Sequence, residues 1–332
     1  MNHVSSITSP TSLAEIMGLT AGDRQAMDAL IRKRLRSDVL LVNQIGEYII
    51  NAGGKRLRPL VHLLSARACG YGGMAHTQLA AVIEFIHTAT LLHDDVVDGS
   101  ERRRGQRTAH QVWGNAASVL VGDFLYSRSF QLMVELESNS IMSILADTTN
   151  TIAAGEVLQL MQLGDIELDE SGYLKVIGDK TACLFAAAAR LGAVISESPR
   201  EVEQSLADFG FALGQAFQIT DDWLDYSGKD DALGKNLGDD LAEGKVTLPL
   251  ILALKAAEKA DRDFLIETIH AGGTDELDRV REVLMKTGAL DDALERATAF
   301  SERACRALAP LPPSAERDSL ELLARFAVDR SL

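Results

Sequence analysis

Two clusters of acidic residues with the same spacing constrain this chain more than any other feature. Residues 94–98 read Asp-Asp-Val-Val-Asp, and residues 221–225 read Asp-Asp-Trp-Leu-Asp. Each cluster closes a long apolar stretch of helical period. Positions i and i+4 share a helix face, so Asp94 and Asp98 should point the same way. Because like charges at this spacing destabilise a bare helix, the pattern indicates a counter-charge between the clusters.

Because both clusters consist of carboxylates, a hard metal cation is a suitable counter-charge. Mg²⁺ prefers oxygen ligands, keeps several waters and usually bridges a few carboxylates to substrate phosphates. The sequence therefore predicts a pocket in which two acidic walls hold a diphosphate through Mg²⁺. A solvated acidic helix is the alternative for the second cluster, but it leaves unexplained the apolar residues among its acids, namely Phe217, Ile219, Trp223 and Leu224.

The charge balance and the cysteines exclude other classes. The chain has 33 Lys and Arg against 48 Asp and Glu, a net charge of −15, which argues against a non-specific nucleic-acid binder. Cys69, Cys183 and Cys305 are scattered, so we expect a reducing compartment and neither a disulfide framework nor a zinc site. The N-terminus lacks a signal-peptide core, and no apolar run reaches the roughly 18 residues of a membrane span. We therefore expect a soluble, cytoplasmic chain.

Helical periodicity runs through almost the whole chain, and neither strand alternation nor a hairpin signal stands out. The 7 prolines fall between periodic segments or at plausible helix starts. We therefore predict an all-α helical bundle in a single domain over residues 1–332, with 1–20 as a flexible or peripheral segment. The segments that we expect to be helical lie near 22–36, 38–51, 59–70, 75–97, 116–136, 140–163, 170–195, 199–227, 246–258, 275–286 and 288–308.

The first basic element lies at residues 53–59, which read Gly-Gly-Lys-Arg-Leu-Arg-Pro. Glycines at a helix junction let backbone N–H groups approach an anion, and the following helix start favours negative charge. Lys55 and Arg58 would add direct diphosphate contacts. The alternative is a glycine cap followed by solvated charges.

Further basic and polar residues accompany the acidic clusters. The run Arg102–Arg104 follows the first cluster, while Lys235 and Lys245 follow the second and would return positive charge to it. His87 lies seven residues before Asp94 and so shares its helix face; it could donate to a phosphate, although a core histidine is an equal alternative. The Lys-Thr pair at 180–181 could also reach a diphosphate, but alone it carries little information.

Other all-α classes explain less of this pattern. A ferritin-like di-iron bundle needs two Glu-X-X-His motifs, and residues 84–87 supply one match. An HD-type phosphohydrolase would use His93 and Asp94, but it leaves the second acidic cluster unexplained. A terpene cyclase would share the acidic walls, whereas the basic run at 53–59 indicates a second diphosphate site. A catalytically silent partner subunit usually lacks one of the two clusters.

In combination, four segments resemble the trans-polyprenyl diphosphate synthase family. They are GGKRLRP at 53–59, LLHDDVVDGSERRRG at 91–105, FQITDDWLDYSG at 217–228 and GKNLGDDLAEGKVTLP at 234–249. The similarity covers roughly residues 20–330 and is greatest to long-chain enzymes that make octaprenyl, solanesyl or decaprenyl diphosphate for quinone side chains. It implies an isoprenoid-synthase-type bundle around a deep cavity, usually a homodimer. Isopentenyl diphosphate would extend an allylic primer such as farnesyl or geranylgeranyl diphosphate.

The resemblance also implies residue roles. About three Mg²⁺ ions per site would be held, two at the first cluster and one at the second. Their ligands would be Asp94, Asp98 and Asp221, and the other catalytic acids would be Asp95, Asp222 and Asp225. The allylic diphosphate would contact Arg103, Lys180, Thr181, Gln218 and Lys235, with Lys245 nearby. Isopentenyl diphosphate would contact Lys55, Arg58, His87 and Arg104. Ionisation, condensation and proton loss would follow, and none of the three steps needs a protein nucleophile.

The resemblance places a chain-length gate just before the first acidic cluster. Ala89 and Thr90 stand there, and both are small, whereas short-chain members of the family carry a bulky aromatic residue. An open tunnel would therefore give a long product, which would pass to a membrane. Phe130 and Met133 are candidates for the tunnel floor, with ordinary core packing as the alternative.

Overall fold

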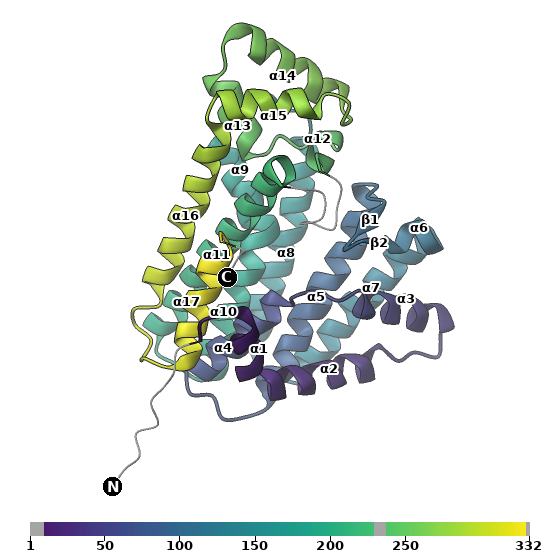
Figure 1. The fold of residues 1–332 in the computed structure, drawn as a ribbon. Helices are drawn as coiled ribbons and strands as arrows, with labels where there is room; N and C mark the ends of the chain where they lie inside the picture. Colours follow the sequence, from purple (N-terminus) through teal and green to yellow (C-terminus); the bar gives the residue numbers. More distant parts are fainter. Residues whose placement is uncertain (1–9, 229–236, 330–332) are drawn as a thin grey trace.

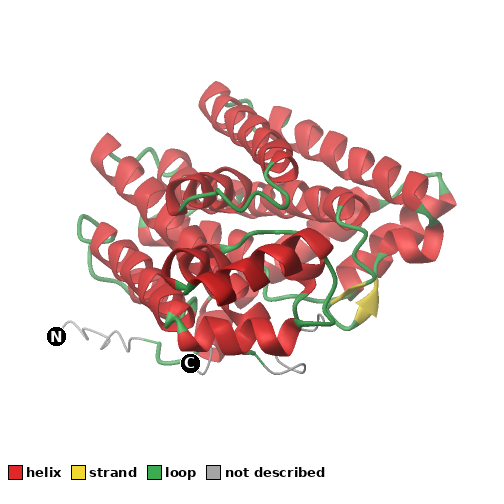
Figure 2. Cartoon of the chain, turned by 90° about the horizontal axis from the view of Figure 1, so that it is seen from above, coloured by secondary structure: helices red, strands yellow, loops and turns green. Residues whose placement is uncertain are grey.

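The structure is a computed structural model that describes residues 10–228 and 237–329. Within these ranges the chain is almost entirely helical, which confirms the predicted all-α class (Figures 1 and 2). In chain order the helical elements are α1 (Leu13–Leu19), α2 (Ala21–Leu35), α3 (Leu40–Asn51), α4 (Leu57–Ala68), α5 (Ala75–Val97), α6 (Ala109–Trp113), α7 (Asn115–Val134), α8 (Asn139–Met161), α9 (Glu170–Ile177), the π-helical turn η1 (Gly178–Ala182), α10 (Cys183–Ile195), α11 (Arg200–Ser227), α12 (Asp239–Ala242), α13 (Leu248–Ala256), α14 (Lys259–Ala271), α15 (Leu277–Lys286), α16 (Ala289–Ala307) and α17 (Ala315–Phe326).

One short hairpin interrupts the helices and was not anticipated from the sequence. Strands β1 (Arg102–Arg103) and β2 (Gln106–Arg107) pair antiparallel. The two residues between them, Arg104 and Gly105, have φ of 54° and 76°, as a tight hairpin turn with two left-handed residues requires. Two-residue strands leave no alternation to read, so the sequence could not reveal them.

Several helices lie outside the predicted segments. They are α1, α6, α12, α14 and α17, and most are short or carry many charges. In α17 the apolar residues Leu320, Leu323 and Phe326 are buried, although charged residues surround them in the sequence. The run of prolines just before α17 hid this helix, because prolines there end a periodic pattern.

Two hydrophobic cores hold the bundle together. The main core lies among α4, α5, α7, α8, α10 and the first part of α11, which stand side by side in Figure 1. The second lies among the end of α11, α13, α14, α15 and the start of α16. Helix α11 contributes Phe209 to the main core and Tyr226 to the second, and α16 likewise packs into both. These two long helices therefore join the cores.

Both acidic clusters lie at the C-terminal ends of long helices. Asp94 is in the last turn of α5, Asp98 caps it, and residues 221–225 fall near the end of α11. Neither helix has a basic residue in its last turn. A helix C-terminus carries partial negative charge, so carboxylates there are unfavourable unless cations compensate them. The fold therefore creates a region of negative electrostatic potential that favours the binding of cations.

The N-terminal segment is more integrated than the expected flexible or peripheral piece. From Leu13 onward it forms α1, which contacts α17, and its Ile16 is fully buried in the main core. Residues 1–9 lie outside the described part of the chain. None of the helices in the described part is long and apolar enough to cross a membrane.

Candidate active site

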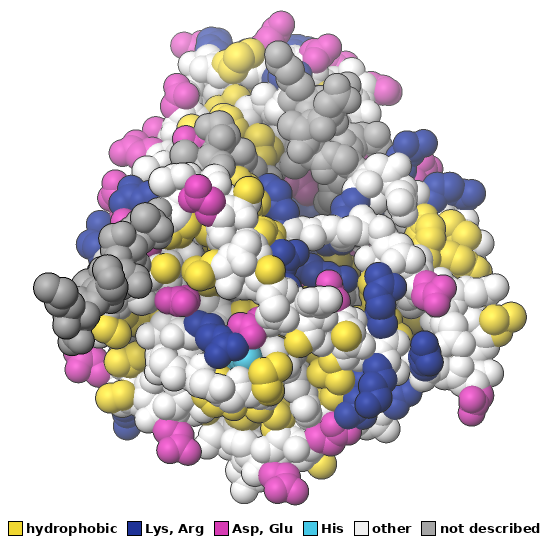
Figure 3. Space-filling model, turned by 60° about the horizontal axis from the view of Figure 1, so that its bottom comes forward, with side chains coloured by type: hydrophobic (Ala, Val, Ile, Leu, Met, Phe, Trp, Pro, Cys, Tyr) yellow, Lys and Arg dark blue, Asp and Glu magenta, His cyan; other side chains and the backbone are white. Residues whose placement is uncertain are grey.

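A cavity of about 600 Å³ lies between the two acidic clusters and gathers most of the predicted site residues. In a space-filling view, Lys and Arg side chains gather near the middle of one face, with hydrophobic atoms beside them (Figure 3). The predicted residues that line the cavity are Lys55, Arg58, His87, Thr90, Asp94, Asp98, Arg103, Arg104, Lys180, Thr181, Gln218, Asp221, Asp222, Asp225 and Lys245. Lys235 lies outside the described residues.

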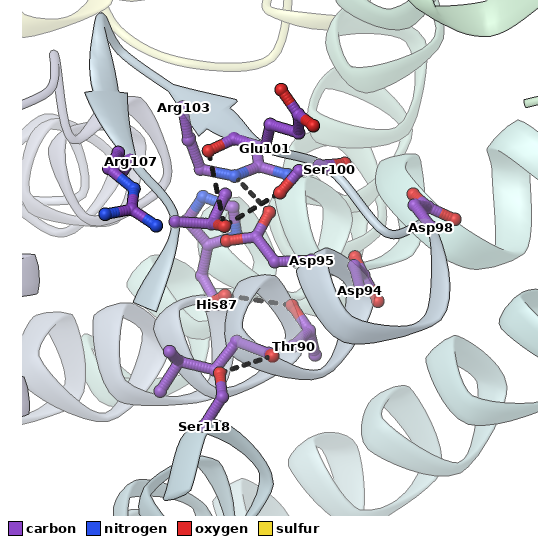
Figure 4. A network of polar contacts seen from close by, with 12 residues as sticks. His87, Thr90, Asp94, Asp95, Asp98, Ser100, Glu101, Arg103, Arg107 and Ser118 are labelled. Carbon is purple, nitrogen blue, oxygen red and sulfur yellow. Dashed lines mark hydrogen bonds and ion pairs between the residues drawn. The ribbon is translucent and has the colours of Figure 1, made fainter. Parts of the chain in front are cut away.

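Two of the three carboxylates in the first wall line the cavity, and the third points away from it. Asp94 and Asp98 line the cavity, whereas Asp95 points toward the hairpin (Figure 4). Asp95 is 4% exposed and accepts a hydrogen bond from Arg103 Nε at 2.7 Å. Burial raises the pKa of Asp94, and Lys180 partly opposes that rise. The first wall therefore offers two carboxylates to a ligand and uses the third to hold Arg103.

The second wall uses most of its carboxylates within the protein. Asp222 accepts hydrogen bonds from the Tyr173 hydroxyl at 2.5 Å and from Gln218 Nε2 at 2.7 Å. Asp225 accepts from the backbone N–H groups of Gly238 and Asp240, each at 3.2 Å. Burial raises the pKa of Asp222 well above its usual range. Asp221 also borders the cavity.

Lys245 pairs with the first wall rather than with the second, which corrects the expectation from the sequence. Its Nζ lies 2.8 Å from Asp98 Oδ2 and 2.6 Å from Glu243 Oε2. Burial lowers the pKa of Lys245, but Asp240, Asp98 and Glu243 together raise it above its ordinary value. The segment that follows α12 therefore places the positive charge of Lys245 beside Asp98.

Lys180 provides the corresponding charge near Asp94. It lies in η1, and its Nζ is 2.6 Å from Glu156 Oε2, 2.8 Å from Gln159 Oε1 and 3.9 Å from Asp94 Oδ2. The next residue, Thr181, donates to Gln218 Oε1 at 3.0 Å. Adjacent residues of η1 thus face different walls.

A second cationic group lies on the α4 side of the cavity. Arg58 Nη1 is 3.1 Å from His87 Nε2, and the Arg58 guanidinium stands 4.5 Å from the centre of the Phe185 ring. Burial lowers the pKa of Arg58 to about 10. Burial, together with the charge of Arg58, also holds the pKa of His87 well below its usual range. His87 is therefore a neutral imidazole with one N–H to donate.

The glycines at residues 53 and 54 make room for Arg104. Gly54 has φ of 133°, and a Cβ built there would lie 2.6 Å from the Arg104 guanidinium. Arg104 donates to the Gly53 carbonyl. Lys55 follows, with its Nζ 4.2 Å from the centre of the Phe326 ring. Both glycines have a positive φ, which residues with a side chain rarely adopt, so the double glycine suits the backbone against which Arg104 lies.

A second cavity of about 530 Å³ adjoins the first along α5, α7 and α8. The two cavities share Thr90, Asp94 and Asp98, and the second continues past Ile86 and Tyr126. The other residues that line it include Thr149, Ile152, Ala153, Val157 and Leu160. Its lining is mainly apolar, so a hydrocarbon chain that starts at the acidic clusters could enter it.

The residues expected at the gate and floor differ in position. Thr90 lines both cavities, whereas Ala89 is fully buried and lines neither. Phe130 and Met133 also line neither cavity; Met133 is buried, and Phe130 packs edge-on against Tyr126 with ring centres 5.2 Å apart. Of these four residues, Thr90 alone lines a cavity.

Sequence reasoning missed several residues of the site. Glu156 and Gln159 on α8 border both cavities, Tyr173 holds Asp222, and Glu84 lies beside Arg56 at 3.5 Å. Burial and the nearby Asp94 raise the pKa of Glu156 to about 7. Each of these residues sits inside an ordinary helical pattern, so no local signal marks it.

The oxygen donors suit Mg²⁺ that shares its coordination with a substrate. In the ranges that the structure describes, no three acidic, histidine or cysteine residues converge enough to enclose a metal alone. Mg²⁺ usually takes one or two carboxylates and completes its shell with water and phosphate oxygens. Asp94 and Asp98 are one helical turn apart on the cavity wall and fit that requirement.

Comparison with known proteins agrees with this geometry. The chain matches the Polyprenyl synthetase family model over residues 39–286. Octaprenyl diphosphate synthase of Escherichia coli K12 is 47% identical over 320 residues, which covers 96% of this chain and 99% of that protein. The all-trans-nonaprenyl-diphosphate synthase (geranyl-diphosphate specific) of Rhodobacter capsulatus is 45% identical over 317 residues, 95% of this chain and 97% of that protein.

Solved structures give the same result. The crystal structure of a polyprenyl synthase from Caulobacter crescentus CB15, complexed with calcium and isoprenyl diphosphate, aligns with a TM-score of 0.94. It is 46% identical, and the alignment covers 98% of this chain and all of that one. The chain therefore belongs to the polyprenyl synthetase family, and the resemblance seen in its motifs is confirmed.

Proposed function

We propose that the protein is a Mg²⁺-dependent, long-chain trans-polyprenyl diphosphate synthase. It would extend an allylic diphosphate, farnesyl or geranylgeranyl diphosphate, with successive isopentenyl diphosphate units. The observation that carries the proposal is the junction of two cavities, one polar and walled by carboxylates, the other mainly apolar. A diphosphate would be held in the first cavity while its hydrocarbon tail occupies the second.

The allylic diphosphate would bind between the two walls. Asp94, Asp98 and Asp221 would hold the metal ions, about three in number, that bridge to it. Bound Mg²⁺ supplies charge neutralisation, which makes diphosphate a better leaving group. Lys180 and Arg103 would stabilise the charge that develops on its oxygens as the carbon–oxygen bond breaks. The calcium and isoprenyl diphosphate named for the Caulobacter protein support this arrangement.

Isopentenyl diphosphate would bind to the group formed by Lys55, Arg58, His87 and Arg104. Arg58 offers a planar fork of donors, and neutral His87 can add one N–H without further charge. Ionisation of the primer leaves an allylic carbocation, and the double bond of isopentenyl diphosphate attacks it. The departing diphosphate then takes the proton that is lost, so no side chain acts as a nucleophile.

Chain growth would proceed through the second cavity. The mainly apolar surface of this cavity would accommodate the lengthening tail. Thr90 leaves the passage between the cavities open, which favours a long product. The names of the relatives, octaprenyl and nonaprenyl diphosphate synthases, support a product of that class. Such a product suits a quinone side chain and would pass from a cytoplasmic enzyme to a membrane.

We also propose a homodimer. Helices α7 and α8 expose large apolar side chains, among them Leu120 at 65% and Met161 at 78%. Several large apolar side chains exposed on two neighbouring helices support an interaction surface there. Sedimentation or light scattering of the purified chain tests this assignment, and a strictly monomeric active enzyme would contradict it.

Product analysis tests the function directly. The purified enzyme is incubated with Mg²⁺, radiolabelled isopentenyl diphosphate and either allylic primer, and the dephosphorylated products are sized. We expect all-trans products of the octaprenyl to decaprenyl class, with no product after chelation of the metal. Products no longer than geranylgeraniol would contradict the long-chain assignment and leave the prenyltransferase class intact.

A further inference from the structure

The ammonium of Lys180 is held by two residues that belong to neither acidic cluster. Glu156 Oε2 and Gln159 Oε1 lie 2.6 Å and 2.8 Å from Lys180 Nζ, while Asp94 is more distant at 3.9 Å. Both residues project from α8 and border both cavities. The lysine lines the polar cavity, and its two partners lie where that cavity meets the apolar one.

The backbone of α8 is shaped to allow this contact. Gly155 lies against η1 so closely that a Cβ there would be 2.8 Å from the Lys180 backbone nitrogen. That distance is too short for any residue with a side chain, because the atoms that it would meet belong to the backbone. The sequence Gly155–Glu156 thus brings α8 against the lysine and supplies a partner for it.

We propose that Glu156 and Gln159 are positioning residues, which hold the Lys180 ammonium ready to contact the allylic diphosphate. The proposal rests on the role proposed above for Lys180. An ammonium group has three N–H donors, and these two residues accept two of them. Asp94 lies beyond hydrogen-bond distance, so the third donor remains for a diphosphate oxygen.

The benefit of such an arrangement is preorganisation. A lysine has a long, flexible side chain, and fixing it on substrate binding loses conformational freedom. Holding the ammonium before the substrate arrives removes that cost from the binding step. Because Gln159 is neutral and Glu156 is acidic, the shared property of the pair is hydrogen-bond acceptance rather than charge alone.

A merely structural role would be that the two side chains join α8 to η1. The two roles differ in one respect: positioning acts through Lys180, whereas structural support does not need the lysine. A double-mutant cycle measures this difference, because residues that act through each other give non-additive effects.

The experiment uses the full-length enzyme with the variants Glu156→Leu, Gln159→Leu and Lys180→Met, singly and combined. We expect Glu156→Leu to lower kcat/KM for the allylic primer roughly 10- to 100-fold, as loss of a hydrogen bond to a charged group does. KM for isopentenyl diphosphate should change by less than about twofold, since its site lies on the α4 side. In the Lys180→Met background, the further loss from Glu156→Leu should be less than about twofold.

Two matched variants complete the design. Glu156→Gln keeps an acceptor and should recover part of the activity, whereas Glu170→Leu, whose partner Arg296 lies 3.4 Å away on the outside of the bundle, should leave kinetics unchanged. Circular dichroism reports folding, and if Glu156→Leu does not fold, the cycle is run with Glu156→Gln and Gln159→Leu. Equal losses with and without Lys180 would overturn the proposal. A normal Lys180→Met enzyme would overturn the role of the lysine itself.

Discussion

The two acidic walls share one spacing but treat their carboxylates differently. In the first wall, Asp94 and Asp98 face the cavity, each with a lysine beside it. In the second, Asp222 and Asp225 border the same cavity yet are only 4% and 6% exposed and accept hydrogen bonds from the protein. The first wall therefore has two carboxylates paired with lysines, whereas two of the three carboxylates in the second wall are buried and hydrogen-bonded within the protein.

The chain that follows each helix causes this difference. After α5 the chain forms the β1–β2 hairpin, and Arg103 of this hairpin donates a hydrogen bond to Asp95. After α11 the described chain resumes at residue 237, and the backbone N–H groups of Gly238 and Asp240 reach Asp225. Helical spacing sets the face on which a carboxylate lies, and the adjacent loop decides whether that carboxylate remains available to a metal.

A second contrast lies one helical turn before each cluster. The first wall has Thr90 there and the second has Phe217. Thr90 lines both cavities, whereas Phe217 lines the polar cavity only. A growing hydrocarbon chain would therefore leave along the first wall.

The first residue of each cluster should matter most, and equally for both walls. We expect Asp94→Asn and Asp221→Asn each to lower kcat by ~10²–10³, since each loses one charge-stabilising contact in the transition state. Thermal unfolding should stay within a few degrees of wild type, because neither residue is part of a core. Steady-state kinetics with circular dichroism measures both. Near-normal turnover in either variant would remove that wall from the metal site.

The last residue of each cluster should separate the walls. Asp98→Asn should lower activity by roughly tenfold or more, because it removes a cavity carboxylate. It should cost less stability than Asp225→Asn, because Lys245 keeps Glu243 as an acidic partner. Asp225→Asn should instead reduce the free energy of unfolding by about 1–3 kcal/mol, because a buried hydrogen-bond network is broken. Urea titration beside kinetics distinguishes the two outcomes. If both variants lose activity without losing stability, the last carboxylate has the same role in both walls, which contradicts the difference described here.

A phenylalanine one turn before Asp94, where the second wall has Phe217, should shorten the product. Thr90→Phe would place a ring where the two cavities meet, so elongation should stop early while the first condensation continues. Ala89→Phe is the matched control, since Ala89 is fully buried, and overpacking there should cost ~1–3 kcal/mol of stability. Mass spectrometry of the products decides the matter. If Ala89→Phe shortens the product and Thr90→Phe does not, the chain takes another path.

The smallest effect should come from the second residue of the first cluster. Asp95→Asn keeps an acceptor for Arg103 but loses its charge, so KM for the allylic primer should rise less than about tenfold. Asp222→Asn, which bonds to Tyr173 and Gln218 instead, should leave the contact of Arg103 untouched. A loss in Asp95→Asn as large as in Asp94→Asn would mean that Asp95 binds metal directly.

Sequence reasoning could predict the helices and the parts of the site that repeat a spacing. The clusters at 94–98 and 221–225 predicted the two acidic walls of the cavity, and the run at 53–59 predicted the basic group around Arg58. Contacts between distant segments could not be read in this way. Lys245 follows the second cluster in the chain but pairs with Asp98, and Glu156 lies in an unremarkable stretch of α8. The i, i+4 spacing places Thr90 on the face of Asp94, but the burial of Ala89 away from both cavities depends on how α5 packs against its neighbours.

The π-helical turn η1 has a consequence for how the chain can change. Its hydrogen bonds enclose one residue more than those of an α-helix, so the helix after it is rotated by about 100° relative to an uninterrupted one. Through that rotation, Lys180 keeps its place at the cavity while α10 keeps Ala188 and Leu191 in the main core. Deletion of a single residue from η1 would rotate either Lys180 away from the cavity or the apolar face of α10 away from the main core. Length variation at this point of the chain should therefore be far less tolerated than substitution.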